Sequence, residues 1–208
     1  KKTLGEGLTR INNAAIQKGY SEIKTDHFIL YKQGRVEMQL DNYSAALKYF
    51  DLALEGNENG ADYYYERSKT QQSLKNYSKS TSDLVIALAI NPLDESYLSF
   101  RKRLISILIY DSYKAERNVK LTEALRLVNF SLQLNPYHIK SLRRRSYVYI
   151  AKRQIRQAKQ DMDKAIAEVL GIQDGTVAHS AFFVNESVID DSDLDRLQSN
   201  TTEAPLGV

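Results

Sequence analysis

Basic side chains gather towards the carboxyl end of the 208-residue chain, at spacings that suit the binding of an anion. Lys140 and Arg144 lie four residues apart, and on a helix this spacing places two cations on one face, one turn apart. Two such cations can donate charge-assisted hydrogen bonds to one carboxylate. Residues 139–164 hold nine lysines and arginines against two aspartates, a net charge of +7. Residues 171–208 hold seven acidic residues against one arginine, so we expect either an acidic partner or a covering acidic tail.

The sequence offers no set of residues that suits catalysis or metal binding. It has no cysteine, which excludes disulfides, thiol catalysis and cysteine-ligated metals. Its histidines, His27, His138 and His179, have no ligand partner three or four residues away, so no zinc site is expected. Residues 191–195 imitate the start of a calcium loop, but Arg196 replaces the required glycine. We therefore expect a protein that is not an enzyme and that holds no cofactor or metal.

A repeat of 34 residues indicates the elements that would position the cations. Four residues of one segment have counterparts 34 positions later: Tyr43, Ala46, Phe50 and Ala53 correspond to Tyr77, Ser80, Leu84 and Ala87. A fixed period of 20–50 residues is typical of stacked repeats. Asn91-Pro92 and Asn135-Pro136 each close a unit of this kind.

The pattern predicts an all-α fold of four helix pairs, at residues 27–60, 61–94, 95–138 and 139–170. Pro92 and Pro136 lie 44 residues apart, so the third unit has an insertion, either between its helices or extending both of them. We place its first helix at about residues 95–113, a loop at 115–120 and its second helix at 121–134. Residues 1–26 are expected to form a capping helix and residues 171–208 an acidic tail.

The second unit resembles a tetratricopeptide repeat (TPR). The family's pattern positions are filled by an aromatic residue, an arginine, small or apolar residues and a closing proline: Tyr64, Arg67, Ser68, Ser80, Leu84, Ala87 and Pro92. Arg67 departs from the leucine of the pattern. The resemblance covers residues 27–170 and implies a right-handed superhelical solenoid of stacked antiparallel helix pairs. It also implies a non-catalytic interaction module, an adaptor, scaffold or co-chaperone-like domain that holds a peptide or helix of its partner.

In such a fold the first helices of successive units line a groove, and their residues that face away from the core are the expected contacts. The resemblance gives thirteen of them, in the four units: Phe28, Tyr31, Lys32, Arg35 and Met38; Tyr65, Lys69 and Gln72; Arg103; and Lys140, Arg143, Arg144 and Tyr147. Aromatic, arginine and methionine side chains are enriched at recognition surfaces.

The resemblance extends in part to co-chaperone members, whose groove clamps the terminal carboxylate of a chaperone peptide. Lys140 and Arg144 stand at two clamping positions. In the first unit Tyr31 and Arg35 replace the expected lysine and asparagine, and Glu66 places a carboxylate where the second unit should have asparagine. We expect a protein or peptide partner that is acidic or has a free carboxyl terminus, but not the complete clamp.

Two other functions stay open. The array can be a regulatory or structural domain of a larger protein whose groove holds its own tail, around Phe182–Leu197. An RNA-associated repeat is less favoured, because base stacking needs aromatic residues interleaved with cations, and only Tyr147 and Tyr149 lie near Arg143–Arg145. No apolar run reaches the roughly 18–20 residues that cross a bilayer, and we expect a cytoplasmic protein. The sequence does not give the partner or the oligomeric state.

Overall fold

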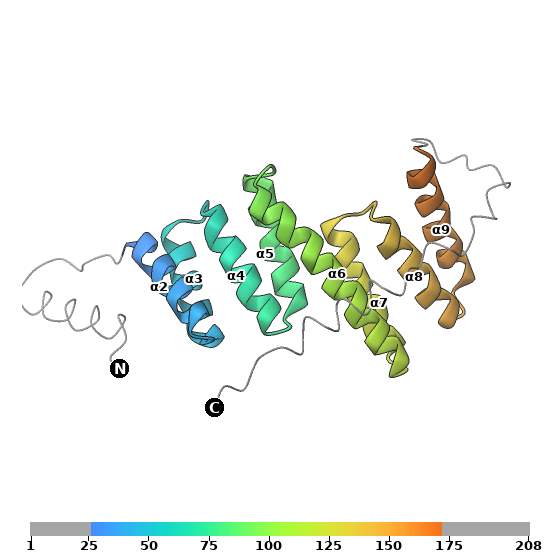
Figure 1. Cartoon of the computed structure of the whole chain (residues 1–208), viewed down its shortest axis with the longest axis horizontal. Helices are drawn as coiled ribbons and strands as arrows, with labels where there is room; N and C mark the ends of the chain where they lie inside the picture. Colours follow the sequence, from blue (N-terminus) through green and yellow to red (C-terminus); the bar gives the residue numbers. More distant parts are fainter. Residues whose placement is uncertain (1–25, 172–208) are drawn as a thin grey trace, which may run out of the picture. The chain divides into compact units, whose positions relative to one another are not determined.

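The computed structural model describes residues 26–171, which form eight helices and no strand (Figure 1). The helices follow one another in four pairs: α2 His27–Gln39 with α3 Tyr43–Gly56, α4 Ala61–Ser73 with α5 Tyr77–Ile90, α6 Glu95–Arg117 with α7 Leu121–Leu134, and α8 Ile139–Ala151 with α9 Ile155–Leu170. The prediction of an all-α fold of tetratricopeptide-like helix pairs is confirmed.

The described residues group into two compact units, and the division falls between Ile105 and Ser106, inside α6. Unit 1 contains α2 to α5 with the first half of α6, and unit 2 contains the second half of α6 with α7 to α9. The capping helix expected in residues 1–26 and the tail expected in 171–208 lie outside the described residues, apart from Asp26 and Gly171. The superhelical arrangement of the whole array stays a prediction.

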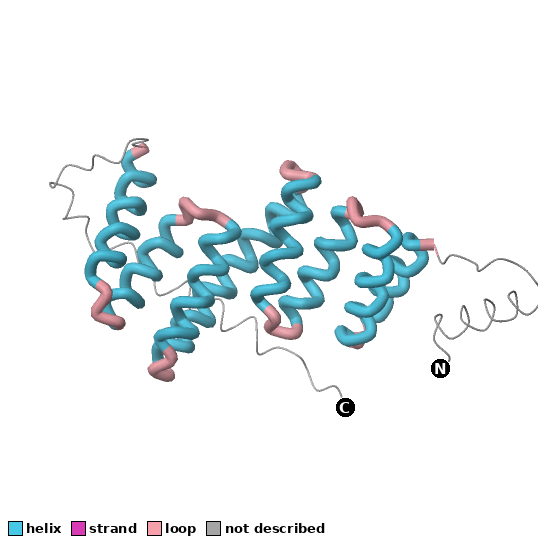
Figure 2. Tube along the Cα trace, turned by 180° about the vertical axis from the view of Figure 1, so that it is seen from behind, coloured by secondary structure: helices cyan, strands magenta, loops and turns pink. Residues whose placement is uncertain are grey.

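Each pair of helices is joined by the same three-residue turn (Figure 2). The middle residue of the turn has a left-handed backbone, with φ of 58° or 59°, at Asp41, Lys75, Val119 and Arg153. In the first turn the N–H of Asn42 donates to the carbonyl of Glu37 at 2.9 Å, and the other turns repeat this bond at 2.8 Å. The bond satisfies a carbonyl at the helix end that has no partner within the helix. The second helix therefore starts four residues after the first one ends.

The insertion of the third pair lies wholly in α6. This helix has 23 residues where α2, α4 and α8 have 13, whereas α7 has 14 residues, as α3 and α5 do. The expectation of a loop from Ala115, and of an insertion shared by both helices or placed between them, is wrong. Residues 113–117 contain no glycine or proline that would end a helix. Ala115 is a buried residue within α6. The predicted second helix, Leu121–Leu134, is confirmed.

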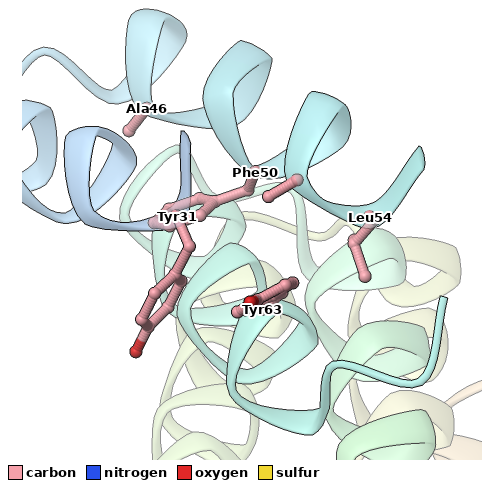
Figure 3. Close-up of a cluster of buried hydrophobic side chains, with 6 residues drawn as sticks. Tyr31, Ala46, Phe50, Leu54 and Tyr63 are labelled. Carbon is pink, nitrogen blue, oxygen red and sulfur yellow. The ribbon is translucent and has the colours of Figure 1, made fainter. Parts of the chain in front are cut away.

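One buried cluster of unit 1 lies between α2, α3 and α4. Tyr31 of α2, Phe50 of α3 and Tyr63 of α4 are buried in one cluster (Figure 3). Gly34 lies so close to Phe50 that a Cβ atom at this position would be 2.6 Å from the ring. The same position 34 residues later is Ser68, whose hydroxyl donates to the carbonyl of Ser80 at 2.7 Å. Small residues therefore allow α2 to approach α3, and α4 to approach α5, closely.

The core of unit 2 combines apolar and hydroxyl side chains. Val128 and Leu132 of α7, Leu142 of α8 and Ala165 of α9 form a buried cluster. Beside it, the hydroxyl of Ser131 donates to that of Ser141 at 2.8 Å. Both hydroxyls are buried, so this bond satisfies polar groups that water cannot reach.

One arginine in each unit joins helices through a buried aspartate. In unit 1 the guanidinium of Arg67 donates two hydrogen bonds to Asp83 of α5, at 2.8 and 2.7 Å. Its third nitrogen donates to Asp51 of α3 at 2.7 Å. Asp83 is only 5% exposed, and a buried carboxylate is stable only when it is paired and hydrogen-bonded. This bridge explains why Arg67 stands where the repeat pattern has leucine.

Unit 2 repeats the bridge with Arg145. This guanidinium donates two hydrogen bonds to Asp161 of α9, at 2.6 and 2.7 Å, and a third to Asn129 of α7 at 3.0 Å. Asp161 is 3% exposed. Arg145 is thus a structural residue of unit 2, although it belongs to the strongly basic residues 139–164, which we name the basic run.

Candidate functional site

The structure divides the thirteen predicted contact residues between the units, with nine in unit 1 and four in unit 2. In unit 1, four are exposed and three are half-buried on the surface: Phe28, Lys32, Arg35 and Arg103; Tyr65, Lys69 and Gln72. The other two serve the core. Tyr31 is buried in it, and Met38 packs against it.

Three cations of unit 1 occupy the same position in three successive first helices. Arg35, Lys69 and Arg103 are the ninth residues of α2, α4 and α6. Each lies over an aromatic ring: the distances to the ring centroids are 5.8 Å from Arg35 Cζ to Tyr31, 5.0 Å from Lys69 Nζ to Tyr65 and 5.1 Å from Arg103 Cζ to Phe100. A cation over a ring face gains about 0.5–1 kcal/mol at exposed sites. The rings therefore hold Arg35, Lys69 and Arg103 in place, and we name these three residues the cation ladder.

The rings beneath the ladder pack against further rings. The centroids of Tyr31 and Tyr63 are 4.7 Å apart, as are those of Tyr65 and Tyr97, and Phe100 meets Tyr65 edge-on at 5.7 Å. Burial raises the pKa of the Tyr31 and Tyr65 hydroxyls, so both groups are neutral at physiological pH. The ladder therefore rests on two groups of packed, uncharged rings, Tyr31 with Tyr63 and Tyr65 with Tyr97 and Phe100, which we together name the aromatic layer.

A hollow of about 330 Å³ opens between α4 and the first half of α6. It is lined by two cations of the ladder, two rings and two serines: Lys69 and Arg103, Tyr65 and Phe100, Ser96 and Ser99. The cations and the exposed serine hydroxyls can donate hydrogen bonds to an anionic group, and the rings can contact apolar atoms. The hollow can thus receive a side chain that has both an anionic group and apolar atoms.

A buried carboxylate lies beneath the ladder. Glu66 is 7% exposed, and its Oε2 atom is 2.9 Å from Nζ of Lys69, while Oε1 is 3.8 Å from Nε of Arg35. Because a carboxylate loses several kcal/mol of hydration on burial, it needs such partners. Glu66 positions Lys69 and Arg35 and also neutralises part of their charge. Two further carboxylates act on this site: Asp62, which accepts from Tyr97, and Asp94, whose charge helps to raise the pKa of Tyr65.

In unit 2 the structure turns the predicted clamp residue Arg144 inward. Its side chain is 2% exposed and lies over the ring of Tyr113, with 3.8 Å to the centroid. Two of its nitrogens donate to the hydroxyl and the carbonyl of Ser112, at 3.1 and 3.0 Å, and the third lies 2.6 Å from a carboxylate oxygen of Glu116. Every guanidinium nitrogen is engaged, so Arg144 does not form an exposed pair with Lys140.

The other cations of α8 differ in their exposure. Lys140 is exposed on α8, Arg143 is half-buried, and Arg145 bridges to Asp161. Tyr147, at 43% exposure, is the ninth residue of α8, the position that the cation ladder occupies in unit 1. Tyr149 is half-buried, and its neighbour Val148 is buried. Two of the nine cations in residues 139–164, Arg144 and Arg145, are thus paired inside unit 2, whereas four on the last turn and α9 are exposed: Arg153, Arg156, Lys159 and Lys164.

Sequence reasoning missed Phe100 and Ser96, which line the hollow, because the register of the lengthened α6 was uncertain. A signal was present in the sequence: Arg35, Lys69 and Arg103 are 34 residues apart, which is the repeat period itself. Cations at one repeat position mark one face of the array.

Within residues 26–171, no three histidine or acidic side chains cluster so that they could hold a metal ion. No helix in that part of the chain is long and apolar enough to span a membrane.

Comparison with solved structures finds similar proteins of low sequence identity. The MamA fragment 41-end from Desulfovibrio magneticus RS-1 is 16% identical, with 81% of this chain and 97% of that chain covered and a TM-score of 0.36. YrrB, a TPR protein with an unusual peptide-binding site, is 17% identical, with coverage of 78% and 92% and a TM-score of 0.35. The first TPR of Spaghetti (RPAP3), bound to the HSP90 peptide SRMEEVD, is 16% identical, with coverage of 63% and 96% and a TM-score of 0.32.

These TM-scores are low, so the fold assignment depends on the helix pairs and turns described above. No protein-family model matches the chain, and no curated protein matches it.

Proposed function

We propose that the chain is a non-catalytic interaction module that binds an acidic segment of a partner protein. The binding face is formed in unit 1 by the first helix of each pair: α2, α4 and the first half of α6. The observation that supports this most strongly is the cation ladder, in which Arg35, Lys69 and Arg103 lie over packed aromatic rings. The module acts as an adaptor, scaffold or co-chaperone-like domain in the cytoplasm.

The chemistry of the face favours a peptide with carboxylates. Arginine and tyrosine dominate the binding energy of protein interfaces, because each combines a large contact area with directional hydrogen bonds. The hollow beside Tyr65 adds a place for an apolar side chain next to a charged one. Since much of this face stays in contact with water, we expect an affinity of order micromolar, about −8 kcal/mol.

The electrostatic part of the binding should depend on salt. At 0.15 M ionic strength the Debye length is about 8 Å, so exposed cations act over about one helix diameter. Raising the salt concentration should weaken the complex, mainly by slowing association.

The test uses a fluorescein-labelled acidic peptide and the full chain, with binding followed by fluorescence anisotropy. Each cation of the ladder is here named a rung. Arg35→Gln/Arg103→Gln removes two of the three rungs and leaves Lys69, the close partner of Glu66, in place. The matched control is Lys48→Gln/Lys79→Gln, which removes two exposed cations from the second helices α3 and α5. Both variants lower the net charge equally.

We expect the ladder variant to bind about tenfold more weakly than the native chain, because each lost contact of an exposed ion pair is worth up to about 1 kcal/mol. The control should stay within about twofold of the native chain. Equal losses in the two variants would show that only net charge matters. A labelled oligouridylate that binds as tightly as the peptide would contradict the assignment to a protein partner.

A further inference from the structure

The rungs of the cation ladder are separated by the spacing of the first helices themselves, because all three occupy the same helix position. Helices in contact pack with their axes about 8–10 Å apart. α2 and α4 are in contact, and the rings of Tyr65 and Tyr97 meet between α4 and α6 at 4.7 Å. The backbone positions of successive rungs are therefore about 8–10 Å apart, while the charged ends of Arg35 and Lys69 both reach the Glu66 carboxylate, at 3.8 and 2.9 Å.

A ligand that pairs one carboxylate with each rung must repeat its acidic side chains at the same distance and on one face. An extended strand covers about 10 Å in three residues, but its side chains alternate, so every third one points to the opposite face. A polyproline II helix rises about 3.1 Å per residue with three residues per turn, so every third side chain returns to the same face after about 9.3 Å. Of these two extended conformations, only polyproline II meets both requirements.

The aromatic layer supports the same conformation. Polyproline II segments bind grooves lined by aromatic residues, because their rigid backbone costs little entropy on binding and their prolines fit between rings. In unit 1 each rung of the ladder has a ring directly beside it, and Tyr65 and Phe100 both face the hollow.

We infer that the ladder recognises a polyproline II segment with an acidic residue at every third position, so that seven residues span all three rungs. This inference rests on the proposed function, because it names the ligand of the same face. The outer two rungs contribute more than the middle one, since Lys69 already pairs with Glu66 at 2.9 Å.

The test compares labelled peptides of one composition that differ only in order. The first, EPAEPAE, has a glutamate at every third position, and the second, EEEPAPA, has the same residues with the glutamates together. A third peptide is helix-forming, with glutamates at every seventh position, which in an α-helix are about 10.5 Å apart on one face. Each peptide is titrated into the full chain and into Arg35→Gln/Arg103→Gln.

We expect EPAEPAE to bind about fivefold more tightly than EEEPAPA, which reaches fewer rungs at once. The ladder variant should abolish this preference. Replacing either outer glutamate of EPAEPAE by glutamine should weaken binding more than replacing the middle one.

Equal affinity of EPAEPAE and EEEPAPA, with both weakened in the ladder variant, would overturn the inference and leave the proposed function standing. Tighter binding of the helical peptide would also overturn it. If no acidic peptide binds, the proposed function fails and the inference fails with it.

Discussion

Units 1 and 2 bury opposite charges at the same repeat position. Glu66 and Arg144 are the sixth residues of α4 and α8, and they are 7% and 2% exposed. Glu66 forms ion pairs with Lys69 and Arg35, whose side chains are more exposed than its own. Arg144 forms an ion pair with Glu116, whose side chain is 33% exposed. A buried charge needs partners of opposite sign around it. In both units the buried charge is therefore paired with opposite charges that lie nearer the surface.

This difference explains why the most basic stretch of the sequence is not the best candidate site. Unit 2 uses Arg144 and Arg145 inside its own structure, so their charges are not offered to a ligand. Unit 1 has fewer cations, but it buries a carboxylate and keeps its cations over rings at the surface. The net charge of a sequence segment thus says less about binding than the placement of each charge does.

The largest predicted effects test whether Arg67 and Arg145 stabilise the fold. Arg67→Ala and Arg145→Ala each leave a buried aspartate without its cation, which should lower the free energy of unfolding by about 3–5 kcal/mol. The control, Arg156→Ala, removes an exposed arginine of α9 and should stay within about 0.5 kcal/mol. Urea denaturation followed by circular dichroism measures all three.

If Arg145→Ala is as stable as Arg156→Ala, the basic run is not structural and unit 2 again becomes a candidate binding surface. The double variant Arg145→Met/Asp161→Leu refines the test. It removes both charges and keeps apolar volume, so it should recover most of the stability that Arg145→Ala loses.

A smaller effect follows from exchanging the two buried charges for glutamine. Glu66→Gln frees Lys69 and Arg35, so the acidic peptide should bind about three- to tenfold more tightly. Arg144→Gln leaves the affinity unchanged but lowers the free energy of unfolding by about 2 kcal/mol, because Glu116 and the Ser112 carbonyl lose their partner.

Glu55→Gln serves as the control for Glu66→Gln, since Glu55 is an exposed carboxylate of α3. Equal gains in affinity for these two variants would contradict a specific role of Glu66. A large loss of peptide affinity in Arg144→Gln would move the site to unit 2.

The sequence predicts the helix pairs well because their determinants are local and periodic. Leu121–Leu134 is bounded as expected, and Ala46, Phe50, Leu84 and Ala87 are buried as the 34-residue pattern requires. The extent of α6 was not predictable in this way, because nothing in residues 113–117 ends a helix or demands a loop.

The roles of individual charges depend on partners far away in the sequence. Arg144 is buried because Ser112 and Glu116, at the end of the lengthened α6, accept its hydrogen bonds. Arg145 is paired because α9 places Asp161 next to it. From the sequence alone, Arg143, Arg144 and Arg145 look alike, because the length of α6 and the contact of α8 with α9 are not visible there.

The smallest predicted effect concerns pH and is confined to unit 2. His138 caps α8, where its Nδ1 atom lies 2.8 Å from the hydroxyl of Ser141 and accepts from the Ser141 N–H at 3.3 Å. Burial, with the charge of Lys140, lowers the pKa of His138. The unfolded chain then binds a proton more readily than the folded one, so the contribution of His138 is complete above about pH 6.5 and is lost as the pH falls through the lowered pKa.

His138→Asn keeps a capping side chain but cannot be protonated. The free energy of unfolding of the native chain, relative to this variant, should therefore fall between pH 7.5 and pH 5. In unit 1, α4 begins after Gly60, which provides no side-chain cap, so no matching effect is expected there. A difference between the native chain and the variant that does not change with pH would contradict this role of His138.

The central claim is that unit 1, and not the basic run of unit 2, binds the acidic partner. Mapping amide chemical shifts of the isotope-labelled full chain during titration with EPAEPAE tests it directly. We predict that the largest shifts fall at residues 28–35, 65–69 and 96–103, while Lys140–Tyr147 stays nearly unchanged. If the largest shifts instead fall on Lys140–Tyr147, the assignment of the site to the cation ladder is wrong.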